Sequence, residues 1–364
     1  MAGEETAEEH ESVLAPHRGR AHLWQLAVIG FVASVVGITL GVAIDWFPTQ
    51  ASEEGEAIDT LWDVLIVCSV PMFVLVTTVV LYSVWRFRMA PGEEEIDGPN
   101  LHGNTQIEIV WTAIPAIMLI ALCSYAWVVL VDIEEAAAEP ALEVRAVGEQ
   151  FTWTFYYEVD GEQVASPQLY VPRGRQVDFT VQSKDVIHDF WVPAFRMKVD
   201  AVRGIDTRIR VTPKTLGRFP VVCAELCGIG HSAMRQTAHV VEPPDFEAWL
   251  ADRAAGGGGS EGAGGEEGGG GATPAGDGKA VYVENNCGAC HQLADAGTSG
   301  GVGPSLDEVL PGQDAAAVRA SIVDPGAEIS QGYNPGLMPA TYGDTIQPAQ
   351  LDALVEYLGE VAGE

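Results

Sequence analysis

Three long stretches without a charged residue stand out in the first third of the chain, at residues 23–44, 64–85 and 109–131. At about 1.5 Å per residue, roughly 22 helical residues extend about 33 Å, enough to cross the apolar core of a bilayer. A soluble helix of that length would show a polar face, and these stretches show none. The pattern therefore predicts three membrane-spanning helices.

The first stretch has an alternative interpretation as an export signal. Arg18 and Arg20 precede it and Thr49-Gln50-Ala51 follows it, as around a cleaved signal. Its apolar run is longer than the usual ~7 to 15 residues of a signal, so we expect a retained span.

Basic residues predict the orientation of these spans. Arg18 and Arg20 precede the first span and Arg86 and Arg88 follow the second, whereas residues 45–62 contain only acidic charges. Because basic residues collect on the cytoplasmic side, everything after residue 131 is expected outside the cytoplasm. We expect a multi-pass protein of a prokaryotic plasma membrane.

Residues 140–245 have the pattern of short strands. Runs rich in β-branched and aromatic residues cover 142–159, 176–182, 205–211 and 219–223. Turn residues such as Asp160-Gly161 separate them. The pattern predicts an all-β domain, with an antiparallel sandwich or barrel as the best class.

The end of the chain predicts a linker and a small helical domain. Residues 254–276 are dominated by Gly and contain no large apolar side chain, which is typical of a flexible linker. After Pro348, apolar residues recur at helical spacing at Leu351, Leu354, Val355 and Leu358. The predicted organisation is a tail with an extra hydrophobic helix or signal (1–56), a transmembrane hairpin (57–135), the β domain (136–253), the linker (254–276) and the helical domain (277–364).

Net charge and cysteine content limit the classes of partner and of site that this chain can have. The 364 residues include 51 acidic and 19 basic ones, a net charge of -32, which argues against nucleic acid as a partner and allows either basic protein partners or adaptation to salt. Of six cysteines, four form two close pairs, Cys223 with Cys227 and Cys287 with Cys290. Such sparse pairs indicate metal or haem chemistry rather than a disulfide scaffold.

The run from Cys223 to Met234 contains two thiols, an imidazole and a thioether, which are soft ligands suited to copper. Zinc gains nothing from a thioether, and a disulfide would leave His231 and Met234 without a purpose. His188, just after a strand-like run, is the expected second imidazole. His239 is the alternative, although it lies inside a strand-like run.

This C-x-E-x-C-x3-H-x2-M run, with His188-Asp189-Phe190-Trp191 and Lys198-Val199-Asp200-Ala201, resembles subunit II of cytochrome c oxidases over about residues 57–245. The resemblance implies a cupredoxin-like Greek-key domain with two coppers bridged by Cys223 and Cys227. It also implies the ligands His188, His231, Met234 and the Glu225 carbonyl, and a possible magnesium site at the Glu225 side chain, shared with the catalytic subunit.

Three further features bear on the resemblance. Residues 105–111 resemble the segment whose glutamate opens a proton channel, which implies that role for Glu108; an ordinary interfacial carboxylate is the alternative. The family often has Trp-x-Trp where this chain has Phe151-Thr152-Trp153, so Trp153 is the expected electron-path residue and the usual outer tryptophan is replaced. Arg203 also departs from the family, in which proline is common.

Cys287-Gly288-Ala289-Cys290-His291 is the pattern of a covalent c-type haem site, with His291 as one axial ligand. A thioredoxin-like dithiol is the alternative, but the βαβ context is missing. Met338 is the sole methionine after the linker, and Met338-Pro339 and Gly303–Leu306 resemble an all-α class I cytochrome c. A Met/His pair raises the haem potential, which suits a donor to copper.

Together these features resemble the fused caa-type oxidases. That resemblance implies the electron-accepting subunit of a proton-pumping haem-copper oxidase, partnered by subunit I, other subunits, lipid, and cytochrome c or another upstream donor. Alternatives are a quinol oxidase subunit II, a nitric oxide or nitrous oxide reductase component, and a tethered carrier or copper-delivery protein without a catalytic partner.

Overall fold

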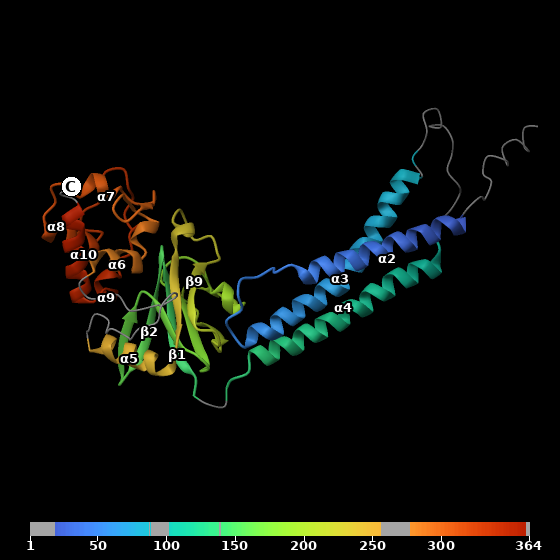
Figure 1. Cartoon of the computed structure of the whole chain (residues 1–364), viewed down its shortest axis with the longest axis horizontal. Coiled ribbons are helices and arrows are strands. Elements are labelled where there is room, and N and C mark those ends of the chain that lie inside the picture. The colour runs from blue at the N-terminus through green and yellow to red at the C-terminus, as the bar shows by residue number, and fades with distance from the viewer. Residues whose placement is uncertain (1–18, 87, 89–101, 138–139, 256–276, 362–364) are drawn as a thin grey trace, which may run out of the picture. The chain divides into compact units, whose positions relative to one another are not determined.

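The computed structural model describes residues 19–86, 88, 102–137, 140–255 and 277–361 (Figure 1). The N-terminal tail and nearly all of the expected linker lie outside the described residues. The described chain divides into two units: one holds most of the long helices, and the other holds residues 47–58 and everything from Leu130 onward.

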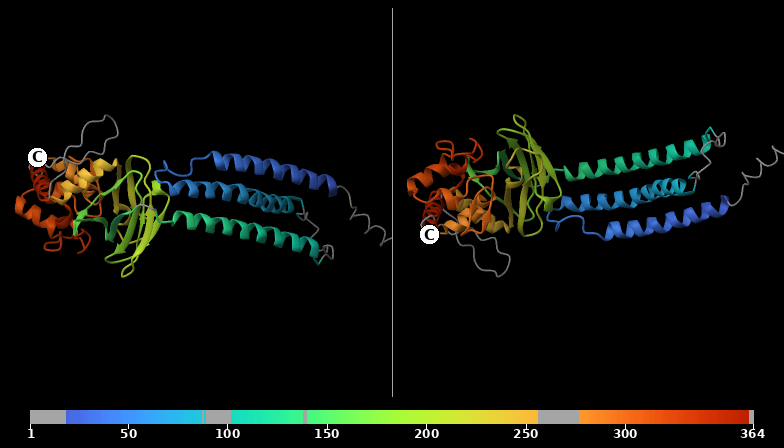
Figure 2. Two further views of the ribbon diagram at one scale, coloured as in Figure 1. Left: turned by 90° about the horizontal axis from the view of Figure 1, so that it is seen from below. Right: turned by 90° about the horizontal axis from the view of Figure 1, so that it is seen from above.

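Three long apolar helices form the first unit: α2 (Gly19–Ala43), α3 (Glu54–Arg86) and α4 (Thr105–Ile133), which run alongside one another in Figure 2. Within the described residues, three segments are long and apolar enough to cross a membrane: Trp24–Ala43, Glu54–Arg86 and Thr105–Ile133. Their large apolar side chains are exposed; Phe73, for example, is 71% exposed. Such a surface suits lipid rather than water, as expected for a membrane protein.

Two glycines on α2 permit a close approach to α3. A Cβ added at Gly37 would lie 2.8 Å from the Val70 side chain, and one at Gly41 would lie 2.7 Å from that of Ile66. Small residues four positions apart are a common contact surface between membrane helices. Retention of the first span stays a prediction.

The β domain in the second unit consists of two five-stranded sheets (Figure 1). The first has the order β3 (Glu162–Ser166), β2 (Thr152–Val159), β1 (Leu142–Glu149), β5 (Val177–Ser183) and β8 (Thr207–Val211). The second has the order β4 (Leu169–Pro172), β10 (Arg235–Val241), β9 (Gly217–Cys223), β6 (His188–Trp191) and β7 (Lys198–Ala201).

Most neighbouring strands pair antiparallel, as expected, but β1–β5 and β4–β10 are parallel. The expectation of a purely antiparallel sandwich is therefore wrong for these two pairs. Parallel neighbours require a long connection, and here the chain passes through other strands before it returns. The long run 142–159 is a hairpin of two strands, β1 and β2. Large buried side chains fill the core, chiefly Trp153, Phe155, Tyr157 and Phe179 from the first sheet and Phe195 from the 3-10 turn that follows β6.

The segment before α3 is part of this β domain. The Ala51 amide donates to the Ala194 carbonyl at 2.8 Å, and the Ala51 carbonyl accepts from the Lys214 amide at 2.8 Å. Ala51 is fully buried. Helix α5 (Pro243–Ala254) completes the domain by burying Phe246 and Leu250.

The C-terminal domain is mostly helical, as expected. It contains α6 (Gly278–Glu284), α7 (Leu306–Val309), α8 (Ala315–Val323), α9 (Tyr342–Thr345) and α10 (Pro348–Val361), with a short hairpin of β11 (Gln292–Leu293) and β12 (Thr298–Ser299). The four apolar residues expected on one face of the last helix are all buried in α10. A Cβ at Gly278 would lie 2.1 Å from the Ala353 carbonyl oxygen, so the crossing of α6 and α10 requires glycine.

The close contact of the α2 glycines with α3 predicts that two glycine substitutions in α2 will differ in their effect on stability. Gly41→Leu should lower the stability of the protein in detergent by roughly 1 to 3 kcal/mol, because the added side chain overlaps Ile66. Gly30→Leu is the matched control, since nothing lies within 4 Å of an added Cβ there. Thermal unfolding followed by tryptophan fluorescence would compare them. Identical midpoints for both variants and the unmodified protein would mean that α2 does not pack here, or is removed.

Candidate copper and haem sites

The sheet brings the expected copper residues together from two neighbouring strands. Cys223 ends β9 and His188 begins β6, and these strands pair antiparallel with Phe190 opposite Cys223. The loop from Cys223 to the start of β10 supplies the other residues, with His231 in a 3-10 turn. Because both flanking strands are fixed in one sheet, the loop has little freedom.

Six groups from these two segments meet at one place. Cys223 Sγ lies 3.8 Å from Cys227 Sγ and 3.9 Å from His188 Nδ1. Cys227 Sγ lies 3.7 Å from His231 Nδ1 and 3.8 Å from Met234 Sδ. The Glu225 carbonyl oxygen is 3.2 Å from Cys223 Sγ. Two thiols are thus central, and the imidazoles, thioether and carbonyl surround them.

Two residues that the sequence analysis missed hold this cluster in position. Asp185 Oδ1 lies 2.7 Å from His188 Nε2, which leaves His188 Nδ1 to face the thiols. Gln150 connects the segment before His188 with the ligand loop. Its backbone amide donates to Asp185 Oδ2 at 2.8 Å, and its side-chain amide donates to the Cys227 carbonyl at 2.5 Å. A carboxylate on the outer nitrogen commonly fixes a ligating histidine. The signal in the sequence was an aspartate three residues before His188.

The electrostatics of the two thiols are unequal. Burial raises the pKa of Cys223, but hydrogen bonds with His188 and nearby backbone groups lower it to about 7. Burial and the neighbouring Cys223 charge raise the pKa of Cys227. Losing both protons therefore requires compensating positive charge at the site. The chemistry of the donors fits copper, since soft thiolates bind it strongly.

Two aromatic side chains pack against this cluster. Trp153 is fully buried, and its ring centroid is 6.0 Å from that of His188. Phe151 contacts the ligand loop so closely that a Cβ at Gly230 would lie 2.4 Å from its ring. The structure thus places both aromatic residues of the Phe151-Thr152-Trp153 segment, which differs from the Trp-x-Trp of the family, beside the cluster.

Glu225 and Glu108 occupy different settings. The Glu225 side chain is exposed, and the metal-ligand cluster found among the described residues consists of His188, Cys223 and Cys227. Glu108 lies in the first turn of α4, where its carboxylate accepts from the Asn104 amide at 3.1 Å while Asn104 Oδ1 accepts from the Ile107 amide at 3.2 Å. Glu108 therefore caps its own helix.

His239, the alternative second imidazole, lies in the β4–β10 region rather than in the cluster. It is 3% exposed and stacks on Tyr170, with ring centroids 4.3 Å apart. Neither ring nitrogen has a hydrogen-bond partner within the described residues. Burial lowers the pKa of His239 to about 3.

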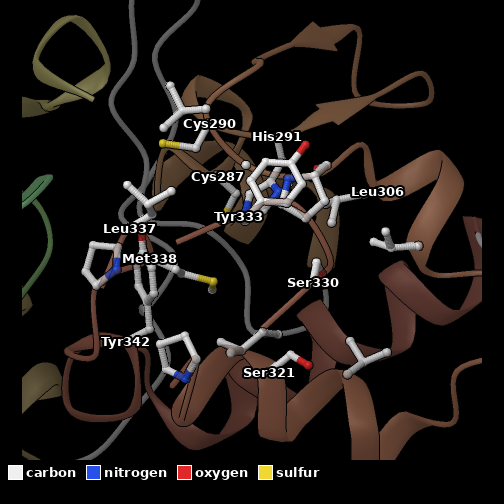
Figure 3. Close-up of a pocket in the computed structure, with 18 of the residues that line it drawn as sticks. Cys287, Cys290, His291, Leu306, Ser321, Ser330, Tyr333, Leu337, Met338 and Tyr342 are labelled. Atoms are coloured by element: carbon white, nitrogen blue, oxygen red, sulfur yellow. The ribbon is translucent and has the colours of Figure 1, made fainter. Parts of the chain in front are cut away.

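The expected haem residues line a single pocket of the C-terminal domain (Figure 3). The His291 ring and the Met338 thioether both point into it, and Cys287 and Cys290 lie at its edge. The remaining lining is largely apolar and includes Leu306, Leu310, Ile322, Tyr342 and Leu354. Such a lining suits a large apolar ring.

The axial histidine is held in one orientation. His291 Nδ1 lies 2.9 Å from the Pro304 carbonyl oxygen, which leaves Nε2 free to bind a metal. Burial lowers the pKa of His291, so the ring stays neutral. A Cβ at Gly303 would lie 2.6 Å from the ring, which explains the glycine in the Gly303–Leu306 segment. The geometry fits a covalently attached haem.

Three family models match the chain: "Cytochrome C oxidase subunit II, transmembrane domain" over residues 38–129, "Cytochrome C oxidase subunit II, periplasmic domain" over 163–241, and "Cytochrome c" over 275–362. The first two match the long helices and the β domain, and the third matches the domain that contains the haem pocket.

Two named relatives and one solved structure are similar to this chain. Cytochrome c oxidase subunit 2 of Thermostichus vulcanus is 32% identical over 291 residues, covering 65% of this chain and 86% of the relative. The subunit 2 of Alkalihalophilus pseudofirmus is 30% identical over 328 residues, covering 85% of this chain and 90% of the relative. The periplasmic domain of the Bradyrhizobium japonicum subunit II is 28% identical, covers 33% of this chain and 98% of that domain, and has a TM-score of 0.31.

The buried His239 predicts a pH-dependent stability. Its pKa is about 3 in the folded chain and about 6.5 when unfolded, so below pH 6.5 only the unfolded chain binds the proton. Stability should therefore fall as pH drops from 6.5 towards 3, by roughly 2 kcal/mol at pH 5. His239→Phe keeps the ring stack and should remove this loss. Thermal midpoints at pH 7.5 and pH 5 would measure it.

The exposed His102 provides the control, since His102→Phe should keep the full acid sensitivity of the unmodified protein. If His239→Phe and His102→Phe lose stability equally on acidification, the buried imidazole is not responsible.

Proposed function

The chain belongs to the cytochrome c oxidase subunit II family, and on that premise we propose that it accepts electrons at its own c-type haem and passes them through a binuclear copper centre to subunit I. The general electron-transfer role follows from the family. The route and its residues are our proposal. In it, subunit I reduces oxygen to water while protons are pumped.

The observation that supports this most directly is the buried group of soft donors. Cys223 and Cys227 would bridge two coppers, with His188, His231, Met234 and the Glu225 carbonyl as the outer ligands. Asp185 and Gln150 would hold the ligand geometry during electron transfer. In the haem domain, Cys287 and Cys290 would form the thioether links, and His291 and Met338 would be the axial ligands.

When bound, haem and copper supply reversible one-electron chemistry, and the protein contributes rigidity and exclusion of water. Trp153 lies against His188 and would carry electrons away from the cluster. The exposed Glu225 carboxylate would meet subunit I, where a magnesium ion is also proposed. A proton-uptake role for Glu108 would require release of its cap on the α4 backbone.

The orientation of the chain in the membrane is also part of the proposal. We propose a prokaryotic plasma membrane with the copper and haem domains outside the cytoplasm, because the basic residues flank the opposite ends of the spans. A soluble cytochrome c or another carrier would supply electrons to the haem domain.

A tethered carrier without a catalytic partner is the second candidate of a different class. Purification from the native membrane distinguishes the two: recovery with a haem-copper subunit supports the oxidase, and recovery of this chain alone supports the carrier.

Replacing a bridging thiol should abolish the mixed-valence copper signal. In Cys227→Ser the hydroxyl is a poor ligand for copper and cannot bridge two ions as a thiolate does. Paramagnetic resonance of the purified protein would record this, with His188→Ala expected to disturb the signal and His239→Phe to leave it intact. A normal signal in Cys227→Ser would contradict the assignment.

Replacing the proposed sixth haem ligand should change the potential without releasing the haem. Met338→His leaves Cys287, Cys290 and His291 in place, so haem remains covalently attached, while loss of the thioether lowers the potential. A redox titration followed by haem absorbance would measure the shift. An unchanged potential would show that another group is the axial ligand.

A further inference from the structure

One side chain connects the two redox domains of the second unit. Asn286 Nδ2 donates to the Ala233 carbonyl at 3.1 Å and to the Arg235 carbonyl at 2.8 Å. Asn286 directly precedes Cys287 of the haem attachment site, and its two acceptors flank Met234 of the copper loop. A covalent and hydrogen-bonded path therefore runs from one proposed cofactor site to the other.

Three other contacts support the same docking. In the β domain, Gln168 directly precedes β4 and donates to the Glu284 carbonyl of the haem domain. The Arg253 guanidinium at the end of α5 donates to the Thr345 carbonyl of the haem domain. Arg253 is itself fixed to the β domain through a 3.0 Å bond to the Ala165 carbonyl. Leu337, the neighbour of Met338, packs against the β-domain core. Both segments that bracket the haem pocket thus touch the copper domain.

Hydrogen bonds to backbone carbonyls dominate this contact between the two domains. Each acceptor is a backbone carbonyl, and the one charged donor, Arg253, is buried and also interacts electrostatically with Glu284. The haem segment is strongly acidic, with Lys279 and Arg319 as its only basic residues. A docking of this kind should respond weakly to salt, because salt screens buried charges little and leaves amide-to-carbonyl bonds largely unaffected.

Asn286 is suited to this position by its backbone as well as its side chain. Its φ of 57° lies in the left-handed region, which asparagine tolerates better than most residues. Asp and Gly also tolerate that region, so each can replace Asn286 with little change of the backbone.

We propose that Asn286 is a positioning residue that couples the haem to the copper centre, by holding the Cys287 attachment loop on the carbonyls either side of Met234. The inference rests on the proposed function. In the step that this contact would serve, the haem would be oxidised by one electron and the copper pair would be reduced by that electron; no proton or covalent bond would be exchanged.

Two measurements on the full-length protein in detergent test this. The first follows haem-to-copper transfer after flash photoreduction of the haem. The second uses a protease site inserted among residues 256–276: after cleavage, size-exclusion chromatography at about 50 mM and about 500 mM salt measures whether the haem fragment stays bound. The variants are Asn286→Asp, which keeps the size and loses the donor, and Asn286→Gly.

The control is Gln331→Glu, which adds the same charge to the haem domain at an exposed position that makes none of the docking hydrogen bonds described above. Losing two hydrogen bonds should weaken retention of the fragment by about tenfold or more. We expect slower transfer and weaker retention in both Asn286 variants, unchanged haem and copper spectra, and little effect of salt or of Gln331→Glu.

The outcomes separate the two proposals. Transfer that is equally fast in the unmodified protein and in both Asn286 variants overturns the coupling role and leaves the proposed function standing. Weaker retention with unchanged transfer overturns it as well, because docking through Asn286 would then not determine the rate. If the unmodified protein shows no haem-to-copper transfer although its fragment stays bound, the proposed function fails together with this route.

Discussion

The constraint on which the β domain depends is the approach of two buried thiols, Cys223 and Cys227, to 3.8 Å. Burial alone opposes their ionisation, and each negative charge opposes the other. Loss of both protons therefore requires compensating positive charge at the site. Strands β6 and β9 fix one thiol and one imidazole in a hydrogen-bonded sheet, so the loop that contains the second thiol closes onto a rigid edge.

Small residues in that loop follow from the same constraint. Gly230 approaches the Phe151 ring so closely that no side chain could be added, and Gly228, with φ at 136°, holds a backbone conformation that other residues avoid. Trp153 packs beside His188, and Phe151 packs against Gly228 and Gly230 of the ligand loop. The ligand loop is therefore shaped by packing as much as by the groups that would bind metal, which favours small structural change during electron transfer.

Sequence patterns predicted the parts of this molecule whose signals are local. Apolar length identified α2, α3 and α4, and the spacing of Leu351 to Leu358 identified the buried face of α10. The spacing of Cys223 to Met234 and of Cys287 to His291 identified two clusters that the fold does assemble. The parallel pairing of β1 with β5, the support of His188 by Asp185, and the contact of Asn286 with the copper loop could not be predicted. Each of these joins residues far apart in the chain or acts through backbone groups that have no residue-specific signal.

The burial of Ala51 in the β domain has a consequence for how this protein is made. Ala51 is hydrogen-bonded to Ala194 and Lys214, residues synthesised well over a hundred positions later and after two long apolar helices. Contacts of such sequence separation form late, because the intervening chain must be closed into a loop first. The β domain can therefore complete its core only after the start of α3 and the end of α4 have reached the same side of the membrane. Correct insertion of the hairpin thus becomes a condition for folding of the domain that receives the metal, and a chain inserted the wrong way would leave Ala51 without its partners.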